Sequence, residues 1–421
     1  MRKSKAEQKK IYVYADWKTL KGIQLMGCLY ASPVRGKEVF SFEYDSVWLK
    51  SAQTSLDPKL QFFSGPLYPS DGHANFGIFL DSSPDRWGRV LMRRREAQQA
   101  REENRLTATL FESDYLLGVF DGHRMGGLRF KTEPEGPFLD NNEEKASPPW
   151  TELRDLEYAS LQLEKDDAEK EKDYMKWLKL LLAPGASLGG ARPKASVVDT
   201  NGELWIAKFP SINDDLNTAG WEITVHELAV MSKINTSPAN VKRFTANYDT
   251  FLTKRFDREN GQRIHFASAM TLLNKKDGDG AEEGVSYIDL ADFLIQNGSQ
   301  VSKDLSELWR RIVFNICVSN VDDHLRNHGF ILTEKGWKLA PAYDMNPSET
   351  GNGLKLNITQ DDNSQSLKLA LEAAEYFRLS DGDAKNILNE VLKAVRQWKK
   401  IAKKYVAAKE ISRMEHAFRV V

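Results

Sequence analysis

Cysteine is nearly absent from this chain: only Cys28 and Cys317 occur among 421 residues, far apart and without a CxxC pair. The sequence therefore indicates neither a disulfide framework nor a zinc ribbon, and a reducing cytoplasm is the compartment that fits best. No apolar run approaches the ~20 residues of a membrane span, and the basic start is followed by IYVYADW rather than by an apolar signal core. We expect a soluble, unexported, cytoplasmic protein without a membrane partner.

A surplus of charge of either sign is also missing. The chain carries 59 basic and 60 acidic residues, a formal net charge of -1, so its overall charge does not indicate a nucleic-acid partner. The hydrophobic fraction of 41% and the charged fraction of 28% are those of a globular protein. A chain of this length is expected to form two or three domains with buried cores.

Changes in composition divide the chain into three parts. Residues 11–50 show short alternating runs broken by Gly and Pro, which is typical of strands and turns. The segment SSPDRWGRVLM predicts a capped helix that begins near Ser83 and continues over residues 84–104. Residues 132–149 are rich in Pro, Asn and Glu and nearly free of aliphatic side chains, so they are interpreted as a surface linker.

A glycine-rich segment, APGASLGGARPK, precedes two predicted strands, ASVVD and ELWIAKF. Gly185, Gly189 and Gly190 have no side chain to keep backbone N–H groups away from a phosphate. The GxxxxGK[ST] pattern of a P-loop is absent, so an ordinary glycine-rich turn remains an alternative for this segment taken alone.

Lys208 lies inside the apolar run WIAKF, where a lysine that points into a cleft or core needs an anionic partner. Exposure at a sheet edge is the alternative. The segment AGWEITVHELAVMSKI predicts an amphipathic helix over residues 219–234, which carries Glu222 and Glu227. Protein kinases hold the nucleotide phosphates with a strand lysine and a helix glutamate. The sequence leaves open which of the two glutamates pairs with the lysine.

A polar cluster, VDDHLRNH, lies between a predicted buried helix and a predicted hairpin. Asp322 and Asn327 have the D-x-x-x-x-N spacing that a kinase catalytic loop uses between its base and its metal-binding asparagine. Asp344, in AYDMN after the hairpin, supplies a second carboxylate where kinases place a magnesium ligand. Phosphoryl transfer needs these groups, because a carboxylate must orient the hydroxyl and hard oxygen ligands must hold magnesium.

Two other interpretations of this cluster exist. Asp322, Asp323, His324 and His328 could form the zinc or manganese site of a metal hydrolase, or they could be turn caps and surface polar groups. The order of the features along the chain favours the kinase, because the glycine-rich loop, strand lysine, helix glutamate, D-x-x-x-x-N and final aspartate follow one another as in kinases.

Several segments together resemble the HipA family of bacterial serine/threonine kinases, the toxin halves of type II toxin–antitoxin modules: SSPDRWGRVLM, SLGGARPKASV, WIAKFP, KRFDR, VDDHLRNHGF and PAYDM. The resemblance spans most of the chain. It implies an α+β, bilobal protein-kinase-like fold. The expected domains are an N-terminal β-rich subdomain over residues 1–135, a kinase N-lobe-like region with the glycine-rich loop over 150–273, and a helical C-lobe with the catalytic and metal-binding loops over 274–421.

The same resemblance implies roles for individual residues. Asp322 would be the catalytic base, and Asn327 and Asp344 would hold Mg²⁺. Ser187 matches the serine that family members autophosphorylate to inactivate themselves. The residues expected to bind ATP are Ser187, Gly189, Gly190, Lys194, Lys208 and Glu222.

Family toxins phosphorylate aminoacyl-tRNA synthetases, which stops translation, and a small helix-turn-helix antitoxin that binds operator DNA restrains them. We therefore expect ATP and Mg²⁺ as cofactors, a protein substrate, an antitoxin partner, and contact with DNA only through the antitoxin. The sequence departs from typical protein kinases in having DMN rather than DFG and no HRD triplet. A catalytically silent, antitoxin-binding co-repressor and a kinase for a non-protein substrate remain as alternatives.

Overall fold

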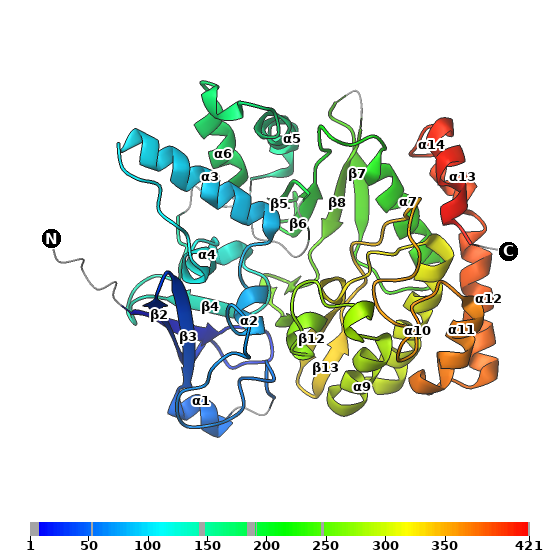
Figure 1. The fold of residues 1–421 in the computed structure, drawn as a ribbon, viewed down its shortest axis with the longest axis horizontal. Coiled ribbons are helices and arrows are strands. Elements are labelled where there is room, and N and C mark those ends of the chain that lie inside the picture. Colours follow the sequence, from blue (N-terminus) through cyan, green and yellow to red (C-terminus); the bar gives the residue numbers. More distant parts are fainter. Residues whose placement is uncertain are drawn as a thin grey trace. The chain divides into compact units, whose positions relative to one another are not determined.

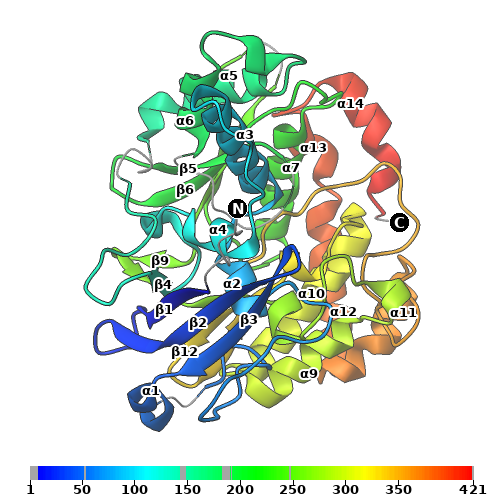
Figure 2. The ribbon, with the colours of Figure 1, turned by 60° about the vertical axis from the view of Figure 1, so that its left-hand side comes forward.

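The computed structural model describes residues 8–51, 54–142, 148–182, 190, 192–245 and 248–419. The chain folds into two compact units (Figures 1 and 2). Unit 1 comprises Met1–Ile206 and Asp257–Ala267, and unit 2 comprises Ala207–Phe256 and Ser268–Val421. The three-part division expected from the sequence is a different partition of the chain and stays a prediction.

Unit 1 contains a four-stranded antiparallel sheet in the order β3-β2-β1-β4. Its strands are β1 (Lys9–Ala15), β2 (Gln24–Val34), β3 (Lys37–Tyr44) and β4 (Leu128–Lys131). Alternate residues of β1, namely Ile11, Val13 and Ala15, are fully buried, which is the period-two pattern of a half-buried strand. The strands that the sequence predicts in residues 11–50 are confirmed as far as Tyr44, whereas Ser46–Ser51 form helix α1 instead.

The helices of unit 1 follow local sequence signals. The longest, α3, begins where the Asp85 carboxylate accepts a hydrogen bond of 2.8 Å from the Gly88 N–H, an N-cap two residues later than expected. The helices are α1 (Ser46–Ser51), α2 (Gly77–Asp81), α3 (Arg86–Glu102), α4 (Glu112–Leu117), α5 (Leu153–Leu163) and α6 (Tyr174–Leu182). The remaining strands are β5 (Lys194–Val198), β6 (Leu204–Lys208), which crosses into unit 2, and the pair β9 (Arg258–Glu259) and β10 (Gln262–Arg263).

The described part of the expected linker is held to unit 1. The Leu139 N–H donates to the Phe130 carbonyl and the Asp140 N–H donates to the Val119 carbonyl, both at 2.8 Å. The linker interpretation is therefore wrong for these residues, because backbone hydrogen bonds compensate for the scarcity of aliphatic side chains.

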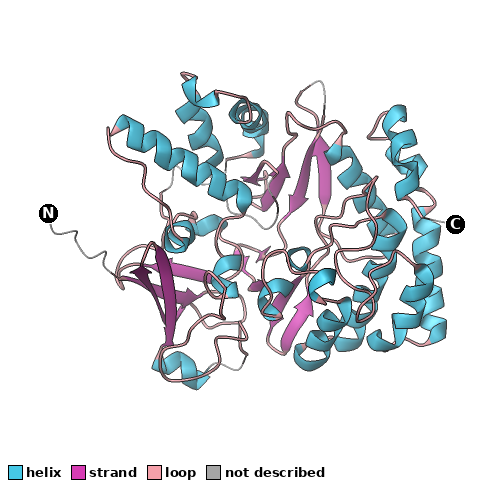
Figure 3. Cartoon of the chain, viewed as in Figure 1, coloured by secondary structure: helices cyan, strands magenta, loops and turns pink. Residues whose placement is uncertain are grey.

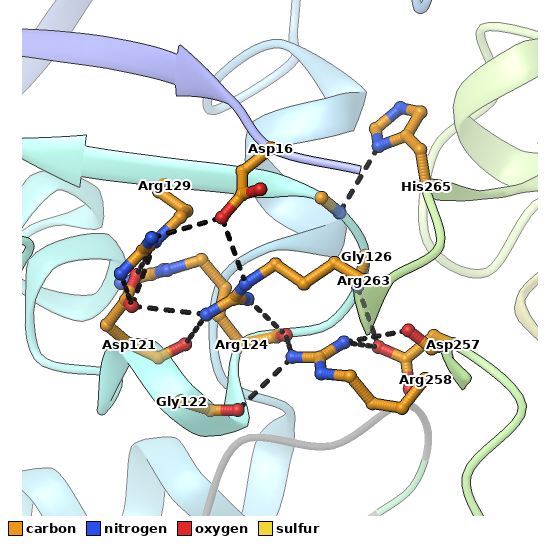
Figure 4. Close-up of polar contacts among 11 residues, drawn as sticks. Asp16, Asp121, Gly122, Arg124, Gly126, Arg129, Asp257, Arg258, Arg263 and His265 are labelled. Atoms are coloured by element: carbon orange, nitrogen blue, oxygen red, sulfur yellow. Dashed lines mark hydrogen bonds and ion pairs between the residues drawn. The ribbon is translucent and has the colours of Figure 1, made fainter. Parts of the chain in front are cut away.

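A network of arginines and aspartates attaches residues 257–265 to unit 1 (Figure 4). Asp121 accepts from Arg129 at 2.6 Å and from Arg263 at 3.1 Å. Asp257 accepts from the Gly126 N–H at 2.9 Å. The second half of the KRFDR segment thus has a structural role in unit 1, since its side chains contact residues more than 130 positions earlier in the chain.

Unit 2 is built mainly from helices, with short strand pairs (Figure 3). Its helices are α7 (Thr218–Met231), α8 (Ala269–Leu272), α9 (Tyr287–Asn297), α10 (Val301–Val318), α11 (Leu367–Glu372), α12 (Asp381–Val395), α13 (Trp398–Ala402) and α14 (Ala408–Arg413). Its antiparallel pairs are β7 (Ala239–Lys242) with β8 (Thr250–Lys254), and β12 (Gly329–Thr333) with β13 (Gly336–Leu339). The strand β11 (Phe266–Ser268) crosses the boundary between the units that lies between Ala267 and Ser268.

Helix α10 is the central helix of unit 2 and positions the polar loop that follows it. Leu305, Leu308, Ile312 and Ile316 recur at three- and four-residue spacing and are almost completely buried. The helix ends where Ser319 adopts the left-handed conformation at φ +49°. The predicted order of buried helix, polar loop and hairpin is confirmed. Among the described residues, none of the helices has the length and apolar character that crossing a bilayer requires.

Candidate phosphoryl-transfer site

Lys208 has its ammonium group between two carboxylates of unit 2. Its Nζ lies 2.6 Å from Oε1 of Glu222 on α7 and 2.5 Å from Oδ1 of Asp344. Burial opposes the charge on Lys208, but the two carboxylates outweigh it and raise the pKa of the ammonium well above its usual value. Lys208 is therefore charged and has the anionic partners that its apolar strand requires.

The structure also decides between the two glutamates of helix α7. Glu222 is buried and pairs with Lys208, whereas Glu227 accepts from the Tyr405 hydroxyl and lies 2.7 Å from Lys404. Helical spacing places these glutamates on different faces of α7, so only one of them can reach the strand lysine.

Asp344 has a backbone conformation that is unusual for a residue with a side chain. Its φ of +59° lies in the left-handed region, where a non-glycine residue is strained. Neighbouring contacts hold the segment in place: the Tyr343 hydroxyl donates to the Arg326 carbonyl at 2.7 Å, and the Ser348 N–H donates to the Ser319 carbonyl at 3.1 Å. Strain that the surroundings maintain in this way is typical of functional positions.

The loop after α10 brings Asp322 and Asn327 together. The Asn327 side-chain Nδ2 donates to the Asp322 carbonyl at 3.1 Å. Asp322 itself is exposed, and its carboxylate accepts no hydrogen bond from the described residues. The backbone of Asp322 is thus fixed by Asn327, while its carboxylate oxygens accept nothing from the described residues. Such a carboxylate is suited to accept a hydrogen bond from a substrate hydroxyl.

Asn327 and Asp344 offer the oxygen ligands that Mg²⁺ prefers. The Oδ1 of Asn327 is buried, and no group in the described part of the chain donates a hydrogen bond to it. An acceptor that is buried without a partner fits a cation ligand. The described residues contain no cluster of three or more His, Cys, Asp or Glu side chains able to hold a metal. Magnesium is commonly held by one or two protein ligands together with water and substrate phosphates.

The metal-hydrolase interpretation requires Asp323 and His328 as free ligands, and the structure pairs them instead. Both are buried, and the His328 Nε2 lies 2.8 Å from Asp323 Oδ2. Burial alone would raise the pKa of Asp323, but His328 and the neighbouring hydrogen bonds lower it below the usual value. The Asp323 carboxylate is thus ionised inside the protein, and its Oδ2 accepts hydrogen bonds from protein groups.

The glycine-rich segment is described only in part. Ser187 and Gly189 lie outside the described residues. Gly190 has φ +82°, a conformation that side chains rarely adopt, and Lys194 begins strand β5. The Lys194 Nζ lies 3.0 Å from Asp85 Oδ2, with both side chains under 5% exposed. Contact of Lys194 with ATP stays a prediction.

Sequence reasoning missed several residues that contact the predicted site residues or their neighbours in each unit. Asp85 gave a usable signal as the helix cap in SSPDRWG, but its pairing with Lys194 links segments more than 100 residues apart. The groups around Asp323 gave no signal, because a buried polar residue has no fixed spacing in sequence. The missed residues in unit 2 are Tyr287, Asn315, Asn320 and Asn346.

Comparison with known proteins identifies the family. Residues 186–399 match the family model of the HipA-like C-terminal domain, and they make up just over half of the chain. The chain belongs to the HipA-like C-terminal domain family. The match contains Lys208, Glu222, Asp322, Asn327 and Asp344.

Two curated relatives are similar to shorter stretches of this HipA-like chain. A putative kinase of Haemophilus influenzae is 37% identical over 101 residues, which are 22% of this chain and 29% of the relative. The putative kinase Y4mE of Sinorhizobium fredii is 27% identical over 183 residues, 38% of this chain and 41% of the relative. The chain thus aligns with less than half the length of either relative.

One solved structure is similar over nearly the whole HipA-like chain. It is the Shewanella oneidensis MR-1 toxin–antitoxin system HipA, HipB and its operator DNA, matched with a TM-score of 0.66 at 17% identity. The match covers 97% of this chain and 94% of that chain. The mixed helix-and-sheet, HipA-like fold expected from the sequence is confirmed.

Proposed function

We propose that this protein is an ATP-dependent serine/threonine protein kinase. The observation that carries the proposal is the position of Lys208, whose ammonium contacts Glu222 on α7 and Asp344 in the AYDMN loop. In protein kinases an ion pair between a strand lysine and a helix glutamate, together with a magnesium-binding aspartate, must be in place for transfer. The ion pairs of Lys208 with Glu222 and Asp344 support this proposal.

Each residue then has a role that its surroundings support. Lys208 contacts the phosphates of ATP while Glu222 holds its ammonium in position. Asp322, exposed and free of hydrogen bonds from the described residues, orients the acceptor hydroxyl and receives its proton. Asn327 and Asp344 hold Mg²⁺, which when bound neutralises charge on the phosphates. The proposal also assigns ATP binding to Gly189 and Gly190, because glycines leave backbone N–H groups accessible to a phosphate.

The family suggests the partners and the acceptor. We assign the acceptor to a protein hydroxyl, with an aminoacyl-tRNA synthetase as the candidate target and Ser187 as the autophosphorylated residue. The Shewanella HipA that shares this fold was solved with HipB and operator DNA. This supports a helix-turn-helix antitoxin as the partner here, with DNA reached through the antitoxin.

A silent co-repressor is the second candidate, and the site argues against it. A protein that only binds an antitoxin has no chemical need for a strained Asp344, a buried Lys208–Glu222 pair and an unpartnered Asn327 oxygen. A kinase for a non-protein hydroxyl would use the same groups, so the acceptor must be determined by experiment.

Intact mass and peptide mapping after incubation with ATP and Mg²⁺ test the proposal. We expect wild type to gain a phosphoryl group on Ser187 and Asp322→Ala to gain none, since the variant lacks the carboxylate that orients the hydroxyl. Asp361→Ala, which removes another exposed aspartate of unit 2, is the matched control and keeps the wild-type rate. If unmodified wild type binds ATP but gains no phosphoryl group, on itself or on added protein, the silent co-repressor becomes the better explanation.

A further inference from the structure

Asp323 accepts three hydrogen bonds on a single carboxylate oxygen. Its Oδ2 lies 2.8 Å from the Tyr287 hydroxyl, 2.6 Å from Asn315 Nδ2 and 2.8 Å from His328 Nε2. These donors come from α9, α10 and the residue that precedes β12, and each of the four residues is less than 5% exposed. One buried carboxylate, that of the residue after Asp322, therefore joins three elements.

The network continues from Asp323 to the Asp344 segment. Asn315 Oδ1 accepts from Asn320 Nδ2 at 3.1 Å, and Asn320 Oδ1 accepts from the Asn346 backbone N–H at 3.2 Å. Asn315 and Asn320 are each 2% exposed. We call Asp323, Asn315 and Asn320 the amide relay, because they connect the loop that holds Asp322 to the loop that holds Asp344.

The Asp323 carboxylate at one end and the Asn346 N–H at the other fix the direction of every hydrogen bond in the relay. An ionised carboxylate only accepts, so Asn315 must turn its NH₂ group toward Asp323 and its oxygen toward Asn320. Asn320 must then donate to Asn315 and present its own oxygen to the Asn346 N–H. His328 must likewise carry a proton on Nε2. A neutral amide in place of Asp323 would leave only the Asn346 N–H, at the other end of the relay, to orient the two asparagine side chains.

We propose that Asp323 is the positioning residue of the phosphoryl-transfer site, acting through Asn315 and Asn320 to set the distance between Asp322 and Asp344. The inference rests on the proposed kinase function and extends it. Asp323 does not touch the reacting atoms: it is buried, whereas its neighbour Asp322 is exposed. Of these two adjacent aspartates, Asp322 faces the substrate and Asp323 holds the loop in position.

Other contacts allow the relay to be broken without unfolding the protein. The Tyr343 hydroxyl and the Ser348 N–H join the same two loops through the Arg326 and Ser319 carbonyls. We therefore expect the loops to stay near each other in relay variants while their relative position becomes less well defined. A small error in position reduces the rate of transfer more than the affinity for ATP, because the reaction depends on alignment.

Three variants test the relay. Asp323→Asn keeps the shape but replaces the anion with a neutral amide whose NH₂ would face other donors. Asn320→Ala cuts the relay beyond Asn315 and leaves the three hydrogen bonds to Asp323 intact. Tyr287→Phe removes one hydroxyl and serves if Asp323→Asn fails to fold. The control is Asp304→Asn, since Asp304 is also buried on the α10 side of unit 2 but accepts from the Leu339 N–H outside the relay.

The readouts are kcat, defined as the first-order rate constant of Ser187 phosphorylation at saturating ATP, the KM for ATP in the same reaction, and amide hydrogen exchange of residues 344–348. We expect kcat to fall about 10- to 100-fold in Asp323→Asn and in Asn320→Ala, as is usual when a supporting hydrogen-bond partner is lost. Tyr287→Phe should show a smaller loss. The KM for ATP should stay near the wild-type value, and exchange at Asn346 should become faster. Asp304→Asn should leave kcat and the exchange at Asn346 unchanged.

The outcomes separate the two proposals. An active wild type with folded Asp323→Asn and Asn320→Ala variants of unchanged kcat overturns the positioning role and leaves the kinase proposal standing. A loss of kcat in Asp304→Asn equal to that in Asp323→Asn also overturns it, since any buried aspartate would then have the same effect. An inactive wild type overturns both.

Discussion

The ammonium of Lys208 lies 2.6 Å from Glu222 Oε1, and the two side chains are only 12% and 6% exposed. Neither charge has much access to water, and Lys208 is the counter-charge of Asp344 as well as of Glu222. Removing one partner of a buried pair leaves a charge that is both unpaired and poorly solvated, which costs more than the pair itself contributes. The Lys208–Glu222 contact is thus both a requirement of the site and a measurable part of the stability of unit 2.

A double-mutant cycle on Lys208 and Glu222 tests this dependence. We expect Lys208→Met to lower the free energy of unfolding by about 3 kcal/mol and the same change in a Glu222→Gln background to cost less. The coupling should be about 1–3 kcal/mol. Urea denaturation of the four proteins measures it.

The exposed pair Lys399–Glu415, with side chains 51% and 55% accessible, provides the control cycle. Its coupling should stay below about 1 kcal/mol because water screens both charges. Equal coupling in the two cycles would show that burial does not matter for Lys208.

Asp85 has two functions that a single substitution can separate. Its Oδ1 caps α3 through the Gly88 N–H, and its Oδ2 pairs with buried Lys194. Asp85→Ser retains a good N-cap but removes the anion, so we expect a loss of about 3 kcal/mol that comes from Lys194 rather than from the cap. Adding Lys194→Met to Asp85→Ser should recover part of the loss. A double variant less stable than Asp85→Ser would contradict this explanation.

Arg124 is fully buried and bonds backbone carbonyls from four places in unit 1. Its guanidinium donates to the carbonyls of Ser82, Leu116, Val119 and Leu139 at 2.7 to 3.0 Å. Lysine cannot reach all four, so Arg124→Lys should leave buried carbonyls unpaired and lower the free energy of unfolding by about 3 kcal/mol or more. Urea denaturation measures the loss. Arg101→Lys, at an exposed position of α3, should change it by less than about 0.5 kcal/mol.

The elements of the site that the sequence predicted are those with local signals. Lys208 within an apolar strand, the amphipathic helix with Glu222, and the spacing of Asp322 and Asn327 are all readable from neighbouring residues. Their order then suggested that Asp344 belongs with them. The structure brings Lys208, Glu222 and Asp344 into contact, and Asn327 to the Asp322 carbonyl.

The parts that could not be predicted depend on tertiary burial. Asp322 and Asp323 are the same residue type at adjacent positions, yet one is exposed and the other is buried among Tyr287, Asn315 and His328. Nothing in their spacing determines which side each carboxylate faces. The return of residues 257–267 to unit 1 is equally invisible in sequence, since it rests on contacts such as that of Asp257 with Gly126.

His265 connects the stability of unit 1 to pH. Its ring is 1% exposed and stacks on Trp17 with centroids 4.6 Å apart, and its Nδ1 faces the Gly127 N–H at 3.4 Å. Burial lowers the pKa of His265 to about 3, whereas an unfolded histidine titrates near about 6.5. Between these values the unfolded chain binds a proton that the folded chain does not, so stability falls as the pH is lowered from 6.5 toward 3.

The size of this pH effect is that of one proton bound by His265 on unfolding. The free energy of unfolding should decrease by about 1.4 kcal/mol per pH unit from His265 alone once the pH is well below 6.5. His265→Asn retains an acceptor near the Nδ1 position but does not titrate, so its stability should fall less steeply between pH 6 and pH 4. Urea midpoints at several pH values, compared between wild type and the variant, measure the difference. His416→Asn, at an exposed position, should follow wild type. If wild type and His265→Asn lose stability in parallel on acidification, His265 already carries its proton in the folded state, and burial does not control its charge.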